Sequence, residues 1–84
     1  MIRKYIEAAL KRAKYKIIED EEPYYGEVPD LPGVWATGIT LEECRLNLAD
    51  AVDAWLLFRI SQGMSVPAIG NLKLRIPVKL KAGV

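Results

Sequence analysis

The chain has 84 residues, a formal net charge of +1 and 51% hydrophobic residues, with a single cysteine and no histidine. This length permits one domain with a thin core, and one cysteine permits no internal disulfide. Without histidine, histidine metal sites and the usual base of Ser-His and Cys-His enzymes are excluded, so we expect no enzyme and no cofactor.

Targeting and membrane signals are also missing from the sequence. It contains neither a signal-peptide core nor an apolar run of eighteen residues, so we expect a cytoplasmic protein. Because the core of so short a chain is thin, we also expect a homo-oligomer, a dimer or a tetramer.

The charges are segregated along the chain. Residues 1–18 hold six basic residues and one acidic one, residues 19–58 hold ten acidic residues and one basic one, and residues 59–84 hold five basic residues. One interpretation is that solvated faces simply differ in charge. The other is that the acidic centre presents a negative surface to a basic partner.

The first half of the chain predicts a helix and a three-stranded meander. Residues 2–14 have the apolar spacing of an amphipathic helix, and residues 15–20 and 24–28 predict antiparallel strands joined by a turn at Pro23. Pro32 and Gly33 predict a turn over residues 30–33, and residues 34–37 predict a third strand. A glycine inside a strand, Gly26, indicates a bulge or a close approach by another chain.

The main helix is predicted from Leu41 to about Gln62. Thr40 and Glu43 have the spacing of a capping box, and Gly63 suits the left-handed residue that follows a helix. Its predicted core face consists of Leu41, Cys44, Leu48, Ala51, Val52, Trp55 and Phe58. Cys44 is therefore interpreted as a small buried hydrophobe and not as a nucleophile. Residues 54–60 are apolar nearly all round, so Leu46, Leu57 and Ile60 require a second surface, either the N-terminal helix or another subunit.

Residues 72–78 alternate apolar and polar side chains and predict a fourth strand, with residues 79–84 as a tail. A right-handed crossover places this strand parallel to the first and beside it. The predicted architecture is one α+β domain spanning residues 1–84, with the N-terminal helix at 2–14 and a βββαβ core at 15–78. Its mixed four-stranded sheet, of order 3-2-1-4, packs on the main helix.

A long motif in this chain resembles the HicB-like antitoxins. It comprises residues 24–38, then Thr40 to Cys44 and Asn47-Leu48, and the resemblance extends over about residues 2–70, with Trp55 and the Gly63 to Pro67 loop. The resemblance implies a truncated ribonuclease H-like fold and the binding and neutralisation of a small basic HicA toxin, an mRNA-cleaving protein. Many members also carry a C-terminal helix-turn-helix or ribbon-helix-helix segment, where this chain has only a short basic tail.

The favoured hypothesis is a non-catalytic antitoxin-like protein that binds a HicA-like toxin. The expected partner surface joins carboxylates to aromatic anchors: Glu19, Asp20, Glu22, Glu27, Asp30, Glu42 and Glu43, with Tyr24, Tyr25 and Trp35. Structural roles compete for single residues, since Glu43 can cap the helix, Asp30 can stabilise its turn, and Tyr24 and Trp35 can fill the core.

Two other hypotheses use different residues. A nuclease of the ribonuclease H kind needs carboxylates converging on paired metal ions, for which Asp20, Glu27, Asp30 and Glu43 are the candidates. An orphan oligomeric domain could instead bind nucleic acid through its basic ends, which comprise Arg3, Lys4, Lys11, Arg12, Lys14 and the final strand. The sequence shows no groove-reading helix or stacking motif for that role.

Overall fold

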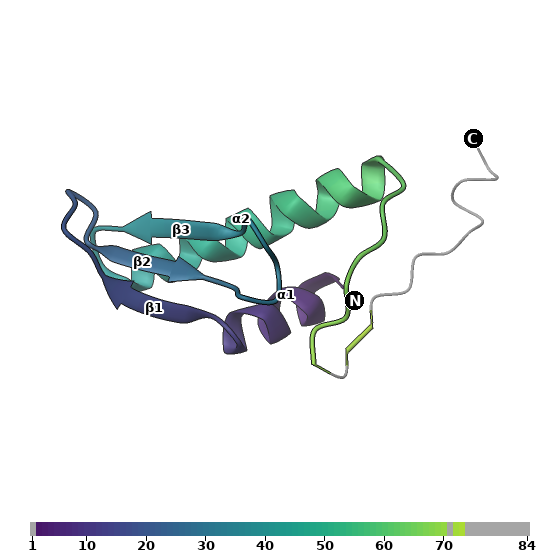
Figure 1. The fold of residues 1–84 in the computed structure, drawn as a ribbon, viewed down its shortest axis with the longest axis horizontal. Coiled ribbons are helices and arrows are strands. Elements are labelled where there is room, and N and C mark those ends of the chain that lie inside the picture. The colour runs from purple at the N-terminus through teal and green to yellow at the C-terminus, as the bar shows by residue number, and fades with distance from the viewer. Residues whose placement is uncertain (1, 71, 74–84) are drawn as a thin grey trace.

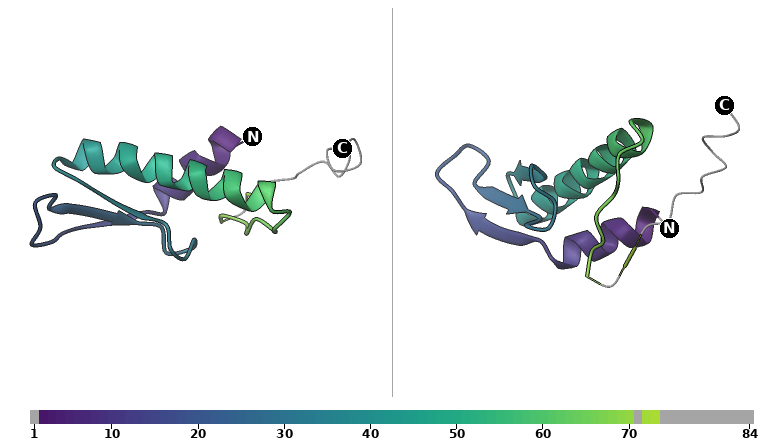
Figure 2. Two further views of the ribbon diagram at one scale, coloured as in Figure 1. Left: turned by 90° about the horizontal axis from the view of Figure 1, so that it is seen from above. Right: turned by 45° about the vertical axis from the view of Figure 1, so that its right-hand side comes forward.

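A three-stranded sheet and a long helix form two layers. The computed structural model describes residues 2–70, 72 and 73. The elements follow the order α1 (Ile2–Lys11), β1 (Lys14–Ile17), β2 (Tyr24–Glu27), β3 (Trp35–Gly38) and α2 (Leu41–Ser61). Helix α2 packs on β3 and β2, and α1 lies alongside α2 beyond the end of the sheet (Figures 1 and 2).

The strand register separates the two faces of the sheet. The strands are antiparallel in the order β1-β2-β3, and one row across them is formed by Tyr15, Gly26 and Ala36. This row faces α2, because Ala36 is buried and Gly26 lies against the Cys44 side chain. Alternation along each strand therefore directs the neighbouring rows away from α2. No described helix covers that outer face (Figure 2).

Two glycines allow α2 to approach the sheet closely. A Cβ built at Gly26 would stand 2.7 Å from the Tyr15 ring and 3.3 Å from Cys44 Sγ, so side chains of this same chain approach Gly26 closely. The register contains no bulge there, and the predicted approach of another chain stays a prediction. A Cβ at Gly38 would stand 2.8 Å from Cys44 Cα and closer still to its backbone N. The end of β3 therefore touches the first turn of α2 backbone to backbone.

Two consecutive turns connect β2 to β3. Leu31 N–H donates to Val28 O at 2.9 Å and Val34 N–H donates to Leu31 O at 3.1 Å. Gly33 adopts φ +87°, which suits the position after Pro32 in a type II turn. The predicted reversal is confirmed one residue later than expected, and Leu31, shared by both turns, is fully buried.

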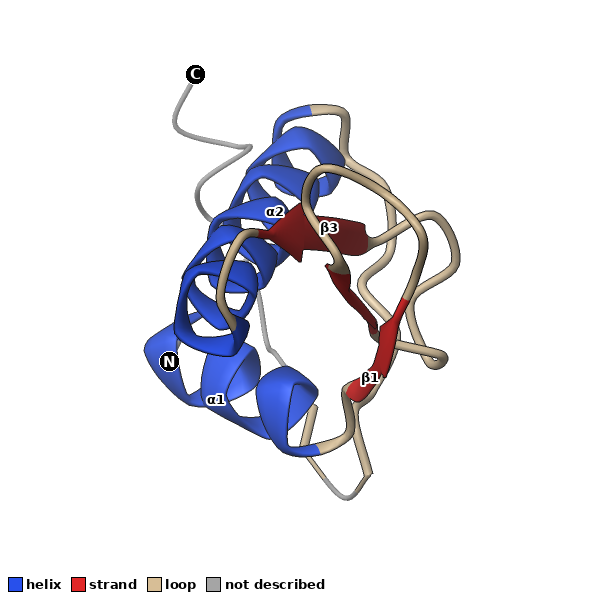
Figure 3. Ribbon diagram, turned by 90° about the vertical axis from the view of Figure 1, so that its left-hand side faces the viewer, coloured by secondary structure: helices blue, strands red, loops and turns tan. Residues whose placement is uncertain are grey.

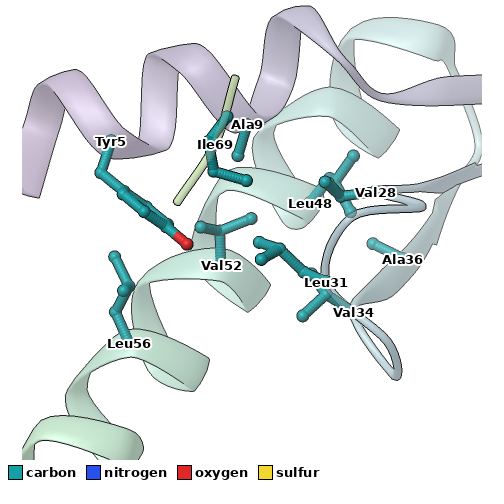
Figure 4. Packing of buried hydrophobic residues seen from close by; sticks show 10 residues of the cluster. All are labelled: Tyr5, Ala9, Val28, Leu31, Val34, Ala36, Leu48, Val52, Leu56 and Ile69. Carbon is teal, nitrogen blue, oxygen red and sulfur yellow. The ribbon is translucent and has the colours of Figure 1, made fainter. Parts of the chain in front are cut away.

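The core lies between α2, α1, the double turn and the loop after α2. Its buried cluster contains Tyr5, Ala9, Val28, Leu31, Val34, Ala36, Leu48, Val52, Leu56 and Ile69 (Figure 4). The Tyr5 hydroxyl donates to Pro67 O at 2.6 Å, which fixes that loop to α1. The core therefore joins both ends of the described chain.

The predicted four-stranded mixed sheet of order 3-2-1-4 is wrong. The sheet has three antiparallel strands, and the described residues place nothing parallel beside β1. After α2 the chain crosses to α1, where Ile69 is buried and pairs with Leu72 across Gly70 at φ +57°. The chain therefore reverses its direction where the fourth strand was predicted to begin. Residues 74–78 of that predicted strand lie outside the described residues.

The predicted core face of α2 is partly wrong. Cys44, Leu48 and Val52 are buried as expected, but Leu41 and Phe58 are exposed, and the unpredicted Leu56 is fully buried. The reason is that the sheet covers only the first half of the 21-residue helix, whereas the second half meets α1 and the loop. The N-terminal helix supplies part of the expected second surface, yet Leu46 and Leu57 remain exposed.

The contact between Gly38 and α2 predicts that two glycine substitutions lower the stability of the fold by different amounts. We expect Gly38→Ala to lower the free energy of unfolding by about 3 kcal/mol, because its Cβ must displace helix backbone. Gly33→Ala is the matched control, since nothing lies within 4 Å of its Cβ and only its φ is unfavourable, at about 1 kcal/mol. Urea unfolding measures both values, and equal losses would contradict the proposed backbone contact.

Candidate functional site

One end of the molecule is acidic. The hairpin between β1 and β2 carries Glu19, Asp20, Glu21 and Glu22, and the first turn of α2 carries Glu42 and Glu43. Both segments lie at the same end of the sheet, because β3 returns to the hairpin end before α2 begins there (Figures 1 and 3). We call these six carboxylates the acidic end.

Hydrogen bonds fix the backbone of the acidic end. Thr37 Oγ1 donates to Glu22 Oε1 at 2.6 Å, which ties the hairpin to β3. The Glu43 N–H donates to Thr40 Oγ1 at 3.0 Å, and Glu43 Oε1 accepts from the Ile39 N–H at 3.1 Å. The predicted capping box is confirmed, so Glu43 has a structural role, whereas Glu42 is exposed beside the positive end of the helix dipole.

The outer sheet face carries an aromatic stack. Tyr25 and Trp35 have ring centroids 6.0 Å apart and ring planes 21° apart, and Lys16 Nζ lies 5.2 Å from the Tyr25 ring centroid. The cation and the two rings thus come from β1, β2 and β3, in that order across the sheet. Trp35 is 56% exposed, so the prediction that it fills the core is wrong.

Glu27 lies beside this stack. A hydrogen bond with Glu27 raises the pKa of Tyr25 above its ordinary value of 10.0, with smaller contributions from desolvation and from the charge of Glu27. The neighbouring carboxylate therefore favours the neutral form of the phenol. This pair lies at the middle strand of the open face.

Three shallow hollows surround the stack. One, of about 150 Å³, lies between Tyr25, Trp35 and the double turn, and one of about 180 Å³ is lined by Lys14, Tyr15, Lys16, Tyr25 and Glu27. A third, of about 490 Å³, is lined by Lys11, Arg12, Ala13, Lys14, Pro29 and Asp30. The first two hollows share Tyr25 and Glu27, and the second and third share Lys14, so the three lie side by side along β1 and the double turn.

The predicted partner-binding residues fall into separate groups. Glu19, Asp20, Glu22, Glu42 and Glu43 belong to the acidic end, and Tyr25, Glu27 and Trp35 belong to the outer sheet face. Tyr24 lies in the row that faces the α2 side, opposite Tyr25. Asp30 lies in the double turn at the other end of the strands, where it accepts from Arg12 Nε at 2.5 Å. The sequence interpretation missed that Lys16 belongs beside the aromatic pair, which only its strand register indicates.

The residues considered for catalysis do not come together. Cys44 is buried, and desolvation raises the pKa of its thiol, which opposes formation of the nucleophilic thiolate. Its Sγ–H donates to Ala36 O at 3.6 Å. Over residues 2–70, 72 and 73, no three Cys, Asp or Glu side chains are grouped to hold a metal ion. Neither described helix is long and apolar enough to cross a membrane.

A family model and a solved structure are similar to this chain. A family model described as UPF0150-like matches residues 4–67. The crystal structure of TTHA0281 from Thermus thermophilus is similar, with a TM-score of 0.86 and 53% sequence identity over 90% of this chain and 94% of that chain. No protein with a curated description matches this chain.

The Tyr25–Glu27 contact predicts a change in the titration of one phenol. We expect Glu27→Gln to lower the pKa of Tyr25 towards its ordinary value, because the hydrogen bond to the carboxylate and its negative charge both favour the neutral phenol. Nuclear magnetic resonance of tyrosine ring carbons during an alkaline titration measures this value. Glu21→Gln in the hairpin is the control, and an unchanged Tyr25 pKa in Glu27→Gln would contradict the contact.

Proposed function

We propose, from the premise that the chain belongs to the UPF0150-like family, that it is a non-catalytic antitoxin-like protein that neutralises a small basic toxin of the HicA type. The family match covers residues 4–67 and contains the HicB-like motif in full. The observation that carries the proposal is the acidic end, where two segments distant in sequence bring six carboxylates to the same end of the sheet.

The geometry of the acidic end supports recognition of a basic protein. Its hairpin is anchored through Thr37 and Glu22, so Glu19 and Asp20 project from a supported turn. Complementary charge mainly increases the association rate and the specificity of such complexes. Asp30 is separate from this surface, because Arg12 already pairs with it.

The placement of the reactive groups supports a binding role over catalysis. The four carboxylates considered for a nuclease are distributed over the hairpin, β2, the double turn and α2, and two of them already accept hydrogen bonds from Arg12 and Ile39. A two-metal nuclease needs such groups to converge. Blocking of the toxin through the acidic end requires no chemistry from this chain.

Self-association is the second part of the proposal. Leu46 and Leu57 are 68% and 53% exposed, and the helical periodicity places both on the side of α2 opposite the buried Leu48 and Val52. Exposed apolar side chains gathered on one helix are typical of protein interfaces. A second copy of this chain packed against α2 would remove them from water.

Charge reversal at the acidic end tests the toxin-binding proposal. We expect Glu19→Lys combined with Asp20→Lys to weaken binding of a catalytically inactivated HicA-type toxin by about tenfold or more, because attraction becomes repulsion. Both residues are exposed and make no hydrogen bond among the described contacts, so the fold should persist. Calorimetry measures the affinity, and rescue of cell growth with the active toxin measures neutralisation.

The control for this test is Glu7→Lys, which reverses the charge of an exposed residue on α1, away from the acidic end. It should leave affinity and growth rescue close to those of the unaltered protein. If unaltered protein fails to bind or neutralise the toxin, or if the two reversals have the same effect, the proposal is wrong.

A glutamate on the outer side of α2 tests self-association. We expect Leu57→Glu to convert the oligomer to a monomer, because each subunit would then bury an unpaired carboxylate in an apolar interface. Light scattering with size-exclusion chromatography measures the mass, and Ile17→Glu, also exposed but on β1, is the control. A monomeric unaltered protein, or an oligomer that persists in Leu57→Glu, would contradict the proposal.

A further inference from the structure

We propose that the outer sheet face binds single-stranded RNA, with a base stacked on Trp35, which Tyr25 supports, and the backbone running beside Lys16, Lys14 and Lys11. This goes beyond the antitoxin-like role, since it uses a different surface of the molecule from the acidic end. The proposal rests on three features of the open face: an aromatic platform, a basic depression and an acceptor between them.

The aromatic platform has the geometry for stacking. Tyr25 stacks with Trp35 and has Lys16 Nζ over its ring, whereas Trp35 lies on the edge strand β3 and is 56% exposed. An aromatic ring on an uncovered sheet offers a flat surface to an unpaired base, which stacks irrespective of its identity. Since Trp35 contributes little to the core, its exposure is explained by a ligand better than by packing.

The basic depression continues from the platform along β1. The hollow at Tyr25 and Glu27 shares Lys14 with the larger hollow at Lys11 and Arg12. Among the described residues Arg12 has a carboxylate partner, Asp30, while the three lysines form no ion pair with a described carboxylate. Ammonium groups placed beside stacked aromatics are the arrangement that follows a phosphate backbone in single-strand sites.

Glu27 supplies the acceptor. Glu27 lines both of the hollows that flank Tyr25. It can accept from base amino groups or from a ribose 2′-hydroxyl, a donor that DNA lacks. The face therefore fits RNA better than DNA. A basic protein fits it poorly, because the lysines would repel it.

Stacking is tested with a labelled oligouridylate of about ten nucleotides, titrated by fluorescence anisotropy at low salt. We expect Trp35→Ala to weaken binding by about five- to hundredfold, the loss typical of one stacked base. Phe58→Ala is the matched control, because Phe58 is also an aromatic residue of similar exposure, 60%, but lies on α2. Circular dichroism confirms that both variants fold.

The basic depression is tested by the salt dependence of the same binding. Lys14→Gln combined with Lys16→Gln should make the slope of log affinity against log salt shallower by about 1.4, since each phosphate contact on a single strand contributes about 0.7. Arg3→Gln combined with Lys4→Gln, on the exposed side of α1, should leave the slope unchanged.

Several results would overturn the proposal. The first is that the oligouridylate does not bind at low salt, and the second is that Trp35→Ala and Phe58→Ala weaken binding equally. The third is equal affinity for the single-stranded DNA of matching sequence. The fourth is that a HicA-type toxin displaces the RNA although it binds Trp35→Ala as well as the unaltered protein, because the RNA would then occupy the toxin-binding surface. Intact binding by the variant with Glu19→Lys and Asp20→Lys would support it, and separates this surface from the acidic end.

Discussion

The approach of β3 to the first turns of α2 determines which face of the sheet is covered. Gly38 brings the strand against the Cys44 backbone, the Cys44 thiol donates to Ala36 O, and Asn47 Nδ2 donates to Thr37 O at 2.9 Å. Thr40 lies between these contacts and caps the helix as the chain reverses. Since backbone atoms cannot interpenetrate, little freedom remains in the position of α2. The opposite face of the sheet is left to solvent or ligands.

The same constraint explains how the remainder of the chain is arranged. Fixed at its beginning, a helix of 21 residues must extend past strands of four residues, so its second half needs other partners. Helix α1 and residues 66–70 and 72 supply them, with Tyr5 and Ile69 in the same cluster as Leu56 (Figure 4). Arg59 adds a hydrogen bond to Ser65 O at 2.7 Å and lies over the Trp55 ring. The outer side of α2 receives no such cover within the described chain.

Local chemistry explains which elements could be predicted from sequence. Thr40, Glu43 and Gly63 act within one helical turn of their own positions, and the structure confirms the capping box and a positive φ at Gly63. The fourth strand depended on long-range pairing, which alternation alone does not specify, and the chain turned back at Gly70 instead. The burial of Leu56 and Phe58 was predicted wrongly because residues 54–60 are apolar nearly all round, so their sequence does not define one buried side. The Tyr25–Trp35 stack required the strand register, which the sequence does not contain.

Charge along the sequence corresponds poorly to charge in space. The acidic block of residues 19–58 is divided by the fold, since Asp30 pairs with Arg12 from the basic N-terminal segment and Glu27 lies among lysines of β1. At physiological salt, charges on the surface are screened beyond about 8 Å. A net charge of +1 therefore says little about what the molecule attracts. The relevant quantities are two local surfaces of opposite sign, which the two-layer fold keeps apart by placing the hairpin at one end of the sheet and the lysines along its open face.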